Sequence, residues 1–271
     1  DPFTVSMGPG DVIELFTPGA TDTDSFSGTL VQEANGRHVQ LLTGVGCGTV
    51  PAGLGPCGHF EDPVLPRGTL GNEYVVPAIM VPADGVVPMP YTLRIQAVSN
   101  GTDLTFEPPS MYKNVTLNAG EALESQGTTD ARVSSSTAFA VTQYLNGGNT
   151  AADQGGPNQL AVTPRSQYQS SYIFLAPQNI NTSTSFASNL AIMAPTGATV
   201  TIDGQTLRPD RFSPVGASGM SVVHLPLNQN DQVHNLTADR PVGAVVYGEA
   251  QYTSFVYSAG QQIKAALGAT P

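Results

Sequence analysis

Tyr91-Thr92-Leu93-Arg94-Ile95-Gln96-Ala97-Val98 is the stretch that decides the fold of this chain. Its apolar and polar residues alternate with a period of two, which places the apolar side chains on one face of an extended strand. Asn100-Gly101 follows, a dipeptide that accepts the positive φ angles of a tight hairpin, and Leu104-Thr105-Phe106 resumes the alternation. We therefore expect two antiparallel strands joined by a short turn.

The same alternation recurs along the chain, with turn dipeptides between the runs. Asn35-Gly36 and Asp203-Gly204 each stand between two such runs. Helical spacing is almost absent, since only Gln261–Leu267 suits a helix, and this segment is short enough to be a tether instead. Strands of this length with such turns between them are typical of antiparallel all-β proteins. We expect an all-β fold of repeated antiparallel β-sandwich-like lobes packed in one chain.

A short unit recurs about every hundred residues. In each copy a turn residue precedes an acid and an apolar residue follows two places on, the acids being Asp11, Glu121 and Asp231, 110 residues apart each time. Two further runs, 72–77 and 171–177, resemble each other and both end in proline. Such self-similarity is typical of one supersecondary unit copied along a chain.

This period predicts three β repeats. The first covers residues 1–85 and the second covers residues 86–185. The third, residues 186–271, is partial and carries a C-terminal tail. A chain of this kind is more often a scaffold or a binding surface than an enzyme with a single pocket, and we expect no catalytic activity.

The composition excludes some partners. Net charge is −11 with only ten Lys plus Arg, so the long-range field disfavours nucleic acid and anionic membranes. Charged residues make up 11% of the chain, so Ser, Thr, Asn and Gln must cover the surface, as is common in secreted proteins. No apolar run approaches the roughly 18 residues of a membrane span, so we expect no membrane insertion.

The two cysteines, Cys47 and Cys57, lie ten residues apart in a segment rich in Gly and Pro. In an exported chain this spacing favours a disulfide that closes a small loop. Two alternatives stay open: a free thiolate with His59 as its base, and a zinc site made by both cysteines, His59 and one of Glu61 or Asp62.

Two long segments interrupt the strand pattern. The first runs from about Gly44 to Gly71 and contains both cysteines, and the second runs from about Asn146 to Gln167. They occupy matching places in the repeat. Long loops in compact domains tend to carry function, so both are candidate contact surfaces.

At this point the residues resemble a known family, the N-terminal domain family of IgGFc-binding proteins. The elements that carry the resemblance extend in order from about residue 38 to 260 and are Gly46-Cys47, Val50-Pro51, Cys57-Gly58-His59, Gly71-Asn72-Glu73-Tyr74, Val141-Thr142-Gln143-Tyr144, Gly156-Pro157, Pro164 with Gln167, Tyr172-Ile173-Phe174, Arg240-Pro241-Val242-Gly243 with Tyr247-Gly248, and Tyr257. The chain departs from the family at Gly58, where an Asp is usual, at Leu70, where an aromatic residue is usual, and in having no Trp. The resemblance implies secreted or surface-attached proteins that serve adhesion or binding.

Tyrosines and loop acids supply the candidate ligand-binding residues. Tyrosine rings beside amides suit contacts with protein or glycan. The candidates are His59, Glu61, Asp62, Tyr144, Tyr168, Tyr252 and Tyr257. We expect no cofactor. Calcium is the strongest candidate for one, through the loop carboxylates Asp22 and Asp24, although their spacing matches no EF-hand.

These observations favour a secreted or cell-surface module that binds an extracellular protein or a mucin-like glycan, as one part of a longer surface protein. The alternative is a structural spacer without a ligand of its own. A glycan-acting enzyme is a third reading, which requires two carboxylates in one cleft, and Glu61, Asp62 and Glu249 are the residues to inspect for it.

Overall fold

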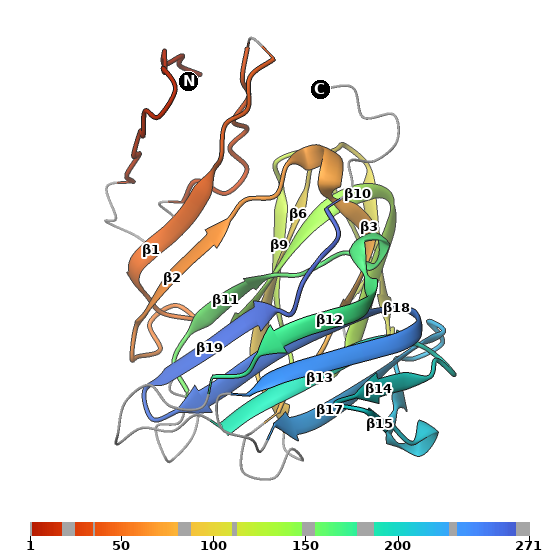
Figure 1. The fold of residues 1–271 in the computed structure, drawn as a ribbon. Coiled ribbons are helices and arrows are strands. Elements are labelled where there is room, and N and C mark those ends of the chain that lie inside the picture. The colour runs from red at the N-terminus through yellow and green to blue at the C-terminus, as the bar shows by residue number, and fades with distance from the viewer. Residues whose placement is uncertain are drawn as a thin grey trace.

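A computed structural model of the chain confirms the all-β fold (Figure 1). The structure describes residues 2–17, 25–34, 36–80, 88–109, 113–147, 155–177, 187–227 and 232–263. Within these ranges the only helical turns are three short 3-10 turns, η1 (Arg67–Thr69), η2 (Arg165–Gln167) and η3 (Pro209–Arg211). The segment from Gln261 that suited a helix is non-helical up to Ile263, and its remainder lies outside the described residues.

Two large antiparallel sheets make up the body of the protein. The first contains β3 (Gly71–Val76), β6 (Tyr91–Ala97), β7 (Thr102–Glu107), β8 (Val115–Leu117), β9 (Ala122–Gly127), β10 (Ala131–Leu145) and β11 (Asn158–Ala161). The second contains β12 (Gln169–Leu175), β13 (Ala187–Pro195), β14 (Val200–Ile202), β15 (Gln205–Thr206), β16 (Ser213–Pro214), β17 (Met220–Leu227), β18 (Val233–Ala250) and β19 (Thr253–Ser258). Two small pairs lie outside them, β1 (Leu42–Gly48) with β2 (Gly58–Pro63), and β4 (Ile79–Met80) with β5 (Pro88–Met89).

One long strand organises each sheet. The first half of β10 pairs with β3 and β7, and its second half pairs with β6 and β11. Likewise, β18 pairs first with β12 and β14 and then with β13 and β19. Because each long strand changes partners midway, each sheet curls on itself, and Figure 1 shows the strands of the two curled sheets crossing.

The prediction of a hairpin at Asn100-Gly101 is correct for the turn and wrong for the strand pairing. The turn forms, with Gly101 at φ 67°, but β6 and β7 do not pair with each other in the described residues. They lie end to end along the same edge of β10. By contrast, Asp203 (φ 49°) and Gly204 (φ 77°) join β14 and β15 in a true two-residue hairpin.

The two sheets are copies of one unit. Tyr74 pairs with Val133 in the first sheet and Tyr172 pairs with Leu236 in the second, and each tyrosine hydroxyl donates to a carbonyl further along the long strand. The runs 72–77 and 171–177 are therefore equivalent, as the sequence indicated. The expected repeat boundaries near residues 85 and 185 fall in segments outside the described residues, and they stay a prediction.

Strand pairing in the second sheet places the third copy of the acid turn at a different position from Asp231. Asp11 and Glu121 form matching turns, whereas Asp231 lies outside the described residues. In the second sheet the strand that pairs with β13 as β9 pairs with β6 is β17, which begins at Met220. The copy of the β9 turn therefore lies near Gly219, twelve residues before Asp231.

Short connectors lead from each unit into the next. η1 and η2 lie 98 residues apart, and each turn is closed by a bond to a proline carbonyl, from Thr69 N to Pro66 O (2.8 Å) and from Gln167 N to Pro164 O (2.9 Å). The Gln167 side chain donates to Thr69 O at 2.5 Å, so the two connectors touch. After β19 the chain returns to the same place, where Gln262 N donates to Gln167 O (3.0 Å).

The core occupies two layers. One cluster lies between the sheets and joins residues such as Tyr74, Phe139 and Tyr247. The other lies inside the curl of the second sheet around Leu190 and Ile192. Both faces of β13 are therefore buried, which explains its continuous apolar run.

Candidate functional site

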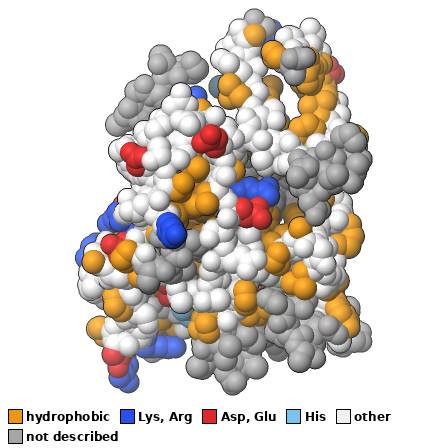
Figure 2. Space-filling model, turned by 180° about the vertical axis from the view of Figure 1, so that it is seen from behind, with side chains coloured by type: hydrophobic (Ala, Val, Ile, Leu, Met, Phe, Trp, Pro, Cys, Tyr) orange, Lys and Arg blue, Asp and Glu red, His pale blue; other side chains and the backbone are white. Residues whose placement is uncertain are grey.

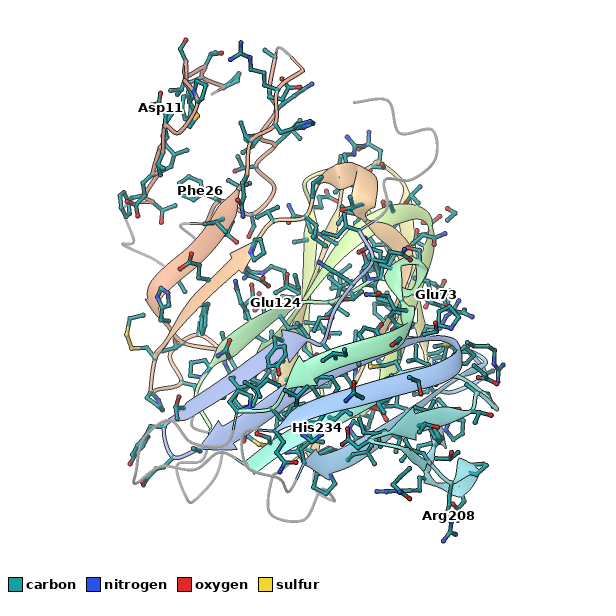
Figure 3. All side chains as sticks on the ribbon, in the orientation of Figure 1. Asp11, Phe26, Glu73, Glu124, Arg208 and His234 are labelled. Carbon is teal, nitrogen blue, oxygen red and sulfur yellow. A yellow bond between two sulfur atoms is a disulfide. The ribbon has the colours of Figure 1, made fainter. Side chains whose placement is uncertain are left out.

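The cysteines form a disulfide at the tip of the β1–β2 hairpin, as expected (Figure 3). Cys47 and Cys57 have Cα atoms 5.1 Å apart. Because both sulfurs are engaged with each other, the thiolate nucleophile and the zinc site that would need these cysteines are excluded.

The two segments taken for long loops contain regular structure. The segment 44–71 holds most of β1, all of β2 and η1, and the segment 146–167 holds β11 and η2. Strand signals were hidden there because glycine and proline interrupt the alternation. The two segments do meet: Gly147 N donates to Val50 O at 2.9 Å, and a Cβ added at Gly58 would lie 2.4 Å from Pro157 O.

A groove of about 330 Å³ lies where β2, β11 and β19 run side by side. These strands occupy the same position in three successive copies of the unit, each paired with the end of a β1-, β10- or β18-type strand. The lining is mostly polar and consists of Glu61, Asp62, Pro63, Leu65, Asn158, Gln159, Leu160, Ala161, Val256, Tyr257, Ser258 and Gln261.

Hydrogen bonds between the three strands fix the walls of the groove. Asp62 accepts a bond from Ala161 N (2.7 Å), which attaches β2 to β11. Burial raises the pKa of the Asp62 carboxyl, and the Ala161 amide opposes that shift. Asn158 donates to Ser254 O (3.0 Å), which attaches β11 to β19.

Three of the predicted ligand-binding residues line this groove: Glu61, Asp62 and Tyr257. His59 lies two residues before Glu61 on β2, and the two exposed side chains approach to 3.5 Å. Tyr144 is half-buried on β10, edge-on to Phe60 of β2 at 6.2 Å and 5.8 Å from the Arg94 guanidinium. The structure thus gathers five of the seven candidates around β2.

The other two candidates lie elsewhere. Tyr168 is 4% exposed and packs in the core against Gly243, so its ring does not face solvent, and burial raises its pKa. Tyr252 is 54% exposed in the turn between β18 and β19 and has a positive φ of 59°. The calcium candidates Asp22 and Asp24 lie outside the described residues.

The sequence reasoning missed the amides that line the groove. Asn158, Gln159 and Gln261 lie in segments without an alternating pattern, so nothing local marked them. The signal that leads to them is the repeat itself, since it places β2, β11 and β19 at equivalent positions.

Glu249, the third carboxylate to inspect, is 2% exposed on β18 rather than in the groove. Neither of its carboxylate oxygens has a hydrogen-bond partner in the described part of the chain. Burial raises its pKa to about 7.

The described residues contain neither a cluster of metal ligands nor a membrane-spanning helix. Across the described ranges, no three His, Cys, Asp or Glu side chains gather as a metal site would require. None of the described helices is long and apolar enough to cross a membrane.

The body of the protein is all-β and carries a disulfide-closed hairpin beside a polar groove. The family model for IgGFc binding protein matches residues 1–248, and the chain belongs to this family. No curated protein and no solved structure matches the chain. The family is one of binding proteins and is not known for enzymes.

Proposed function

We propose that the chain is an adhesion module that recognises an extracellular protein or a mucin-like glycan through the groove between β2, β11 and β19. The observation that carries this proposal is the convergence of Glu61, Asp62 and Tyr257 with three amide side chains in one hollow. Carboxylates and amides supply hydrogen-bond partners for hydroxyl groups. Tyr257 forms part of the wall, because its ring stacks on Phe255 at 6.0 Å and its hydroxyl donates to Leu175 O.

The disulfide contributes to this function by holding the hairpin that carries β2. The contacts that tie this hairpin to the sheets include the strand-edge bond from β11 to Asp62, the Phe60–Tyr144 ring contact and the Gly147–Val50 bond. A covalent tip keeps β2 in register with β1, so the Glu61 side of the groove stays formed.

The test is a glycan and mucin array probed with the intact chain, with the reduced chain and in the presence of EDTA. Specific binding that is lost on reduction supports the groove with its disulfide hairpin. Loss with EDTA instead points to calcium, and thus to Asp22 and Asp24 as ligands.

Point variants locate the site on a ligand that the array finds. Glu61→Gln and Gln159→Ala change the groove walls at exposed or half-buried positions, and each is expected to weaken binding about tenfold, the effect of roughly one lost hydrogen bond to a charged or buried partner. Thr206→Ala, at an exposed position on β15, is the matched control. Equal affinity of all three variants contradicts the groove.

A structural spacer is the second candidate function. The observation that favours it is the shared joint between units, in which η1, η2 and the segment after β19 bond to one another. A chain that binds nothing on glycan, mucin and protein arrays, while circular dichroism shows it folded, supports the spacer.

A further inference from the structure

Residues 2–17 and 36–48 match the second half of the sheet unit in sequence spacing and in hydrogen bonding. Gly8 N donates to Asp11 Oδ2 at 2.7 Å, and Asn118 N donates to Glu121 Oε2 at 2.7 Å. The glycine inside each turn, Gly10 or Gly120, has φ 87°. The two turns are 110 residues apart and have the same geometry.

The residues before and after this turn also match. Val5-Ser6-Met7 stands 110 residues before Val115-Thr116-Leu117, which is β8, and residues 12–17 stand 110 before β9. The N-terminal segment therefore carries the sequence counterparts of β8 and β9.

A backbone hydrogen bond that occurs in all three copies shows which part of the unit the end of the segment corresponds to. Val162 N donates to Val141 O (2.9 Å) beside β10, and Ala259 N donates to Ala244 O (2.8 Å) beside β18. Val64 N donates to Leu41 O (2.9 Å) in the same way. The strand that continues from Leu41 into β1 is thus the counterpart of the final part of β10 and β18, offset by 100 residues from β10.

Within the described residues, this strand is paired along one edge only. In the complete units, the edge of the long strand opposite β11 or β19 is covered by β6 or β13, as at Val141↔Ile95 and Ala244↔Ile192. In the described residues, β1 pairs with β2 alone, and no residue before Leu42 belongs to a strand. Among the described residues up to Gly48, no strand occupies the places that β3, β6 and β7 take beside β10.

The exposure of equivalent side chains shows the consequence. Val39 is 53% exposed where Phe139 is 0%, Val45 is 41% exposed where Leu145 is 1%, and Met7 is 44% exposed where Leu117 is 7%. The large apolar side chains exposed along this segment are Phe3, Val5, Met7, Val12, Ile13, Leu15, Phe16, Phe26, Leu30, Val31, Val39, Leu42 and Val45.

Figure 2 shows hydrophobic side chains gathered on the projection at the upper right, where this segment lies when seen from behind. Figure 3 places Asp11 and Phe26 on the same projection, away from both sheets, while Glu124 lies within the body. The described contacts of the projection with the first sheet are few, such as Ser27 with Arg94 at 3.2 Å and Gly28 against Gly120. An apolar surface of this extent marks an interaction site.

We propose that residues 2–17, 25–34 and 36–48 belong to the open half of a third β-sheet, which is completed by a half-repeat with the strand pattern of β3, β6 and β7. The occupant is therefore a set of antiparallel strands of this family's own kind, which adds to the open edge by backbone pairing and covers the exposed apolar side chains. A second complete copy does not supply them, because its β3, β6 and β7 are already paired with its own β10.

The experiment joins a copy of residues 66–111 ahead of residue 2, which reproduces the natural order of the half-repeats. Hydrogen–deuterium exchange is then measured on residues 12–17 and 39–45 in the fused and the unfused chain. We expect these amides to exchange at least about tenfold more slowly in the fusion, because strand pairing protects them. Unchanged exchange, with β10 and β18 still protected, overturns the proposal.

A control fusion carries Glu in place of the copied residues that correspond to Leu93 and Ile95, which removes the apolar face of the added β6 strand. It is expected to leave the N-terminal amides unprotected. Protection by this control as well would show that any added chain suffices, and would overturn the proposal.

A second variant decides the matter if the fusion disturbs the body of the protein. Val39→Asp with Val45→Asp in the unfused chain is expected to leave Tm unchanged, since these side chains are exposed there. A clear fall in Tm shows that the segment is already packed and overturns the proposal. Sedimentation of the unfused chain as a dimer with protected N-terminal amides makes a second copy the occupant, and overturns it too.

Discussion

Tyr74 and Tyr172 make the same two hydrogen bonds in the two sheets. The Tyr74 hydroxyl donates to Phe139 O (2.6 Å) and accepts from Gly71 N (3.0 Å), and the Tyr172 hydroxyl donates to Val242 O (2.5 Å) and accepts from Gln169 N (2.9 Å). Each tyrosine therefore closes the start of its strand and fixes that strand to the bend of the long strand beside it. Desolvation raises the pKa of Tyr74 to about 12, so its hydroxyl stays protonated and able to donate.

Tyr74→Phe and Tyr172→Phe are each expected to lower the free energy of unfolding by about 1–3 kcal/mol, because a backbone N–H and a carbonyl lose their partner in a buried site. Thermal unfolding is the measurement, and Tm should fall by several degrees. Tyr144→Phe is the matched control, since no hydrogen bond of the Tyr144 hydroxyl is seen within the described residues. Equal Tm values for all three variants would contradict the stabilising role of the Tyr74 and Tyr172 hydroxyl groups.

Glu249 is expected to make the protein less stable as the pH rises. Its pKa of about 7 in the folded chain lies above the ordinary value of 4.5, so the stability that the protonated carboxyl supports is fully present below pH 4.5 and is lost as pH rises through 7. At about 1.4 kcal/mol per pKa unit, the loss is on the order of 3 kcal/mol.

Glu249→Gln should flatten this dependence and raise stability at pH 8 relative to the unaltered chain. Urea unfolding at pH 5, 6, 7 and 8 measures it. Glu14→Gln, which removes the same charge from an exposed position, should leave the profile as it was. A profile for Glu249→Gln that still falls between pH 5 and 8 would falsify the assignment.

The Glu73 carboxylate should act in the opposite direction. Desolvation tends to raise its pKa, but hydrogen bonds from Arg132 (2.7 Å) and Arg165 (2.9 Å) outweigh it, so the pKa is lowered overall. Stability from this group is present above its ordinary pKa of 4.5 and is lost as the pH falls through the lowered value.

Glu73→Gln is therefore expected to destabilise the chain at pH 7 and to reduce its loss of stability between pH 5 and 3. Figure 3 shows Glu73 on the side of the body where the sheets approach each other. Glu124→Gln serves as the control, because its ion pair with Arg94 is more exposed and surface pairs contribute little. If Glu73→Gln and Glu124→Gln change the pH dependence of stability equally, the stabilising role of the Glu73 ion pairs is contradicted.

Removal of the disulfide should act locally. In the variant with both Cys47→Ala and Cys57→Ala, the hairpin loses a closure that constrains about ten residues, an effect of about 2–3 kcal/mol on the hairpin itself. Because β1 and β2 form their own small sheet, hydrogen exchange should become faster in 42–63 and stay unchanged in β10 and β18. Faster exchange throughout both large sheets would show instead that the hairpin is part of the main cooperative unit.

Local sequence patterns predicted strands better than they predicted partners. The alternation at 91–98 became β6, and positive φ at Gly101 and Gly204 followed from the absence of a side chain. The pairing of β6 with β10 rather than with β7 depends on contacts forty residues apart, which no short window contains. The bend of β10 likewise leaves no signal in its composition.

Only part of the candidate site was predicted, because the rest of it also depends on contacts between distant segments. Glu61, Asp62 and Tyr257 stood out as residue types in promising places, whereas Gln159 and Gln261 acquire meaning only when three copies of one strand meet. Tyr168 shows the limit of residue type as a guide. Tyrosine is a residue type typical of ligand-binding surfaces, but the Tyr168 ring fills the space above Gly243.

The joints between the units have a mechanical consequence. Gln167 bonds to both Thr69 and Gln262, so in the described chain each unit ends on the connector that begins the next, without a free linker between them. A protein extended by further units of this kind lengthens as a stiff rod rather than as beads on a string. The reach of such a rod is set by the number of units and not by the entropy of a flexible tether.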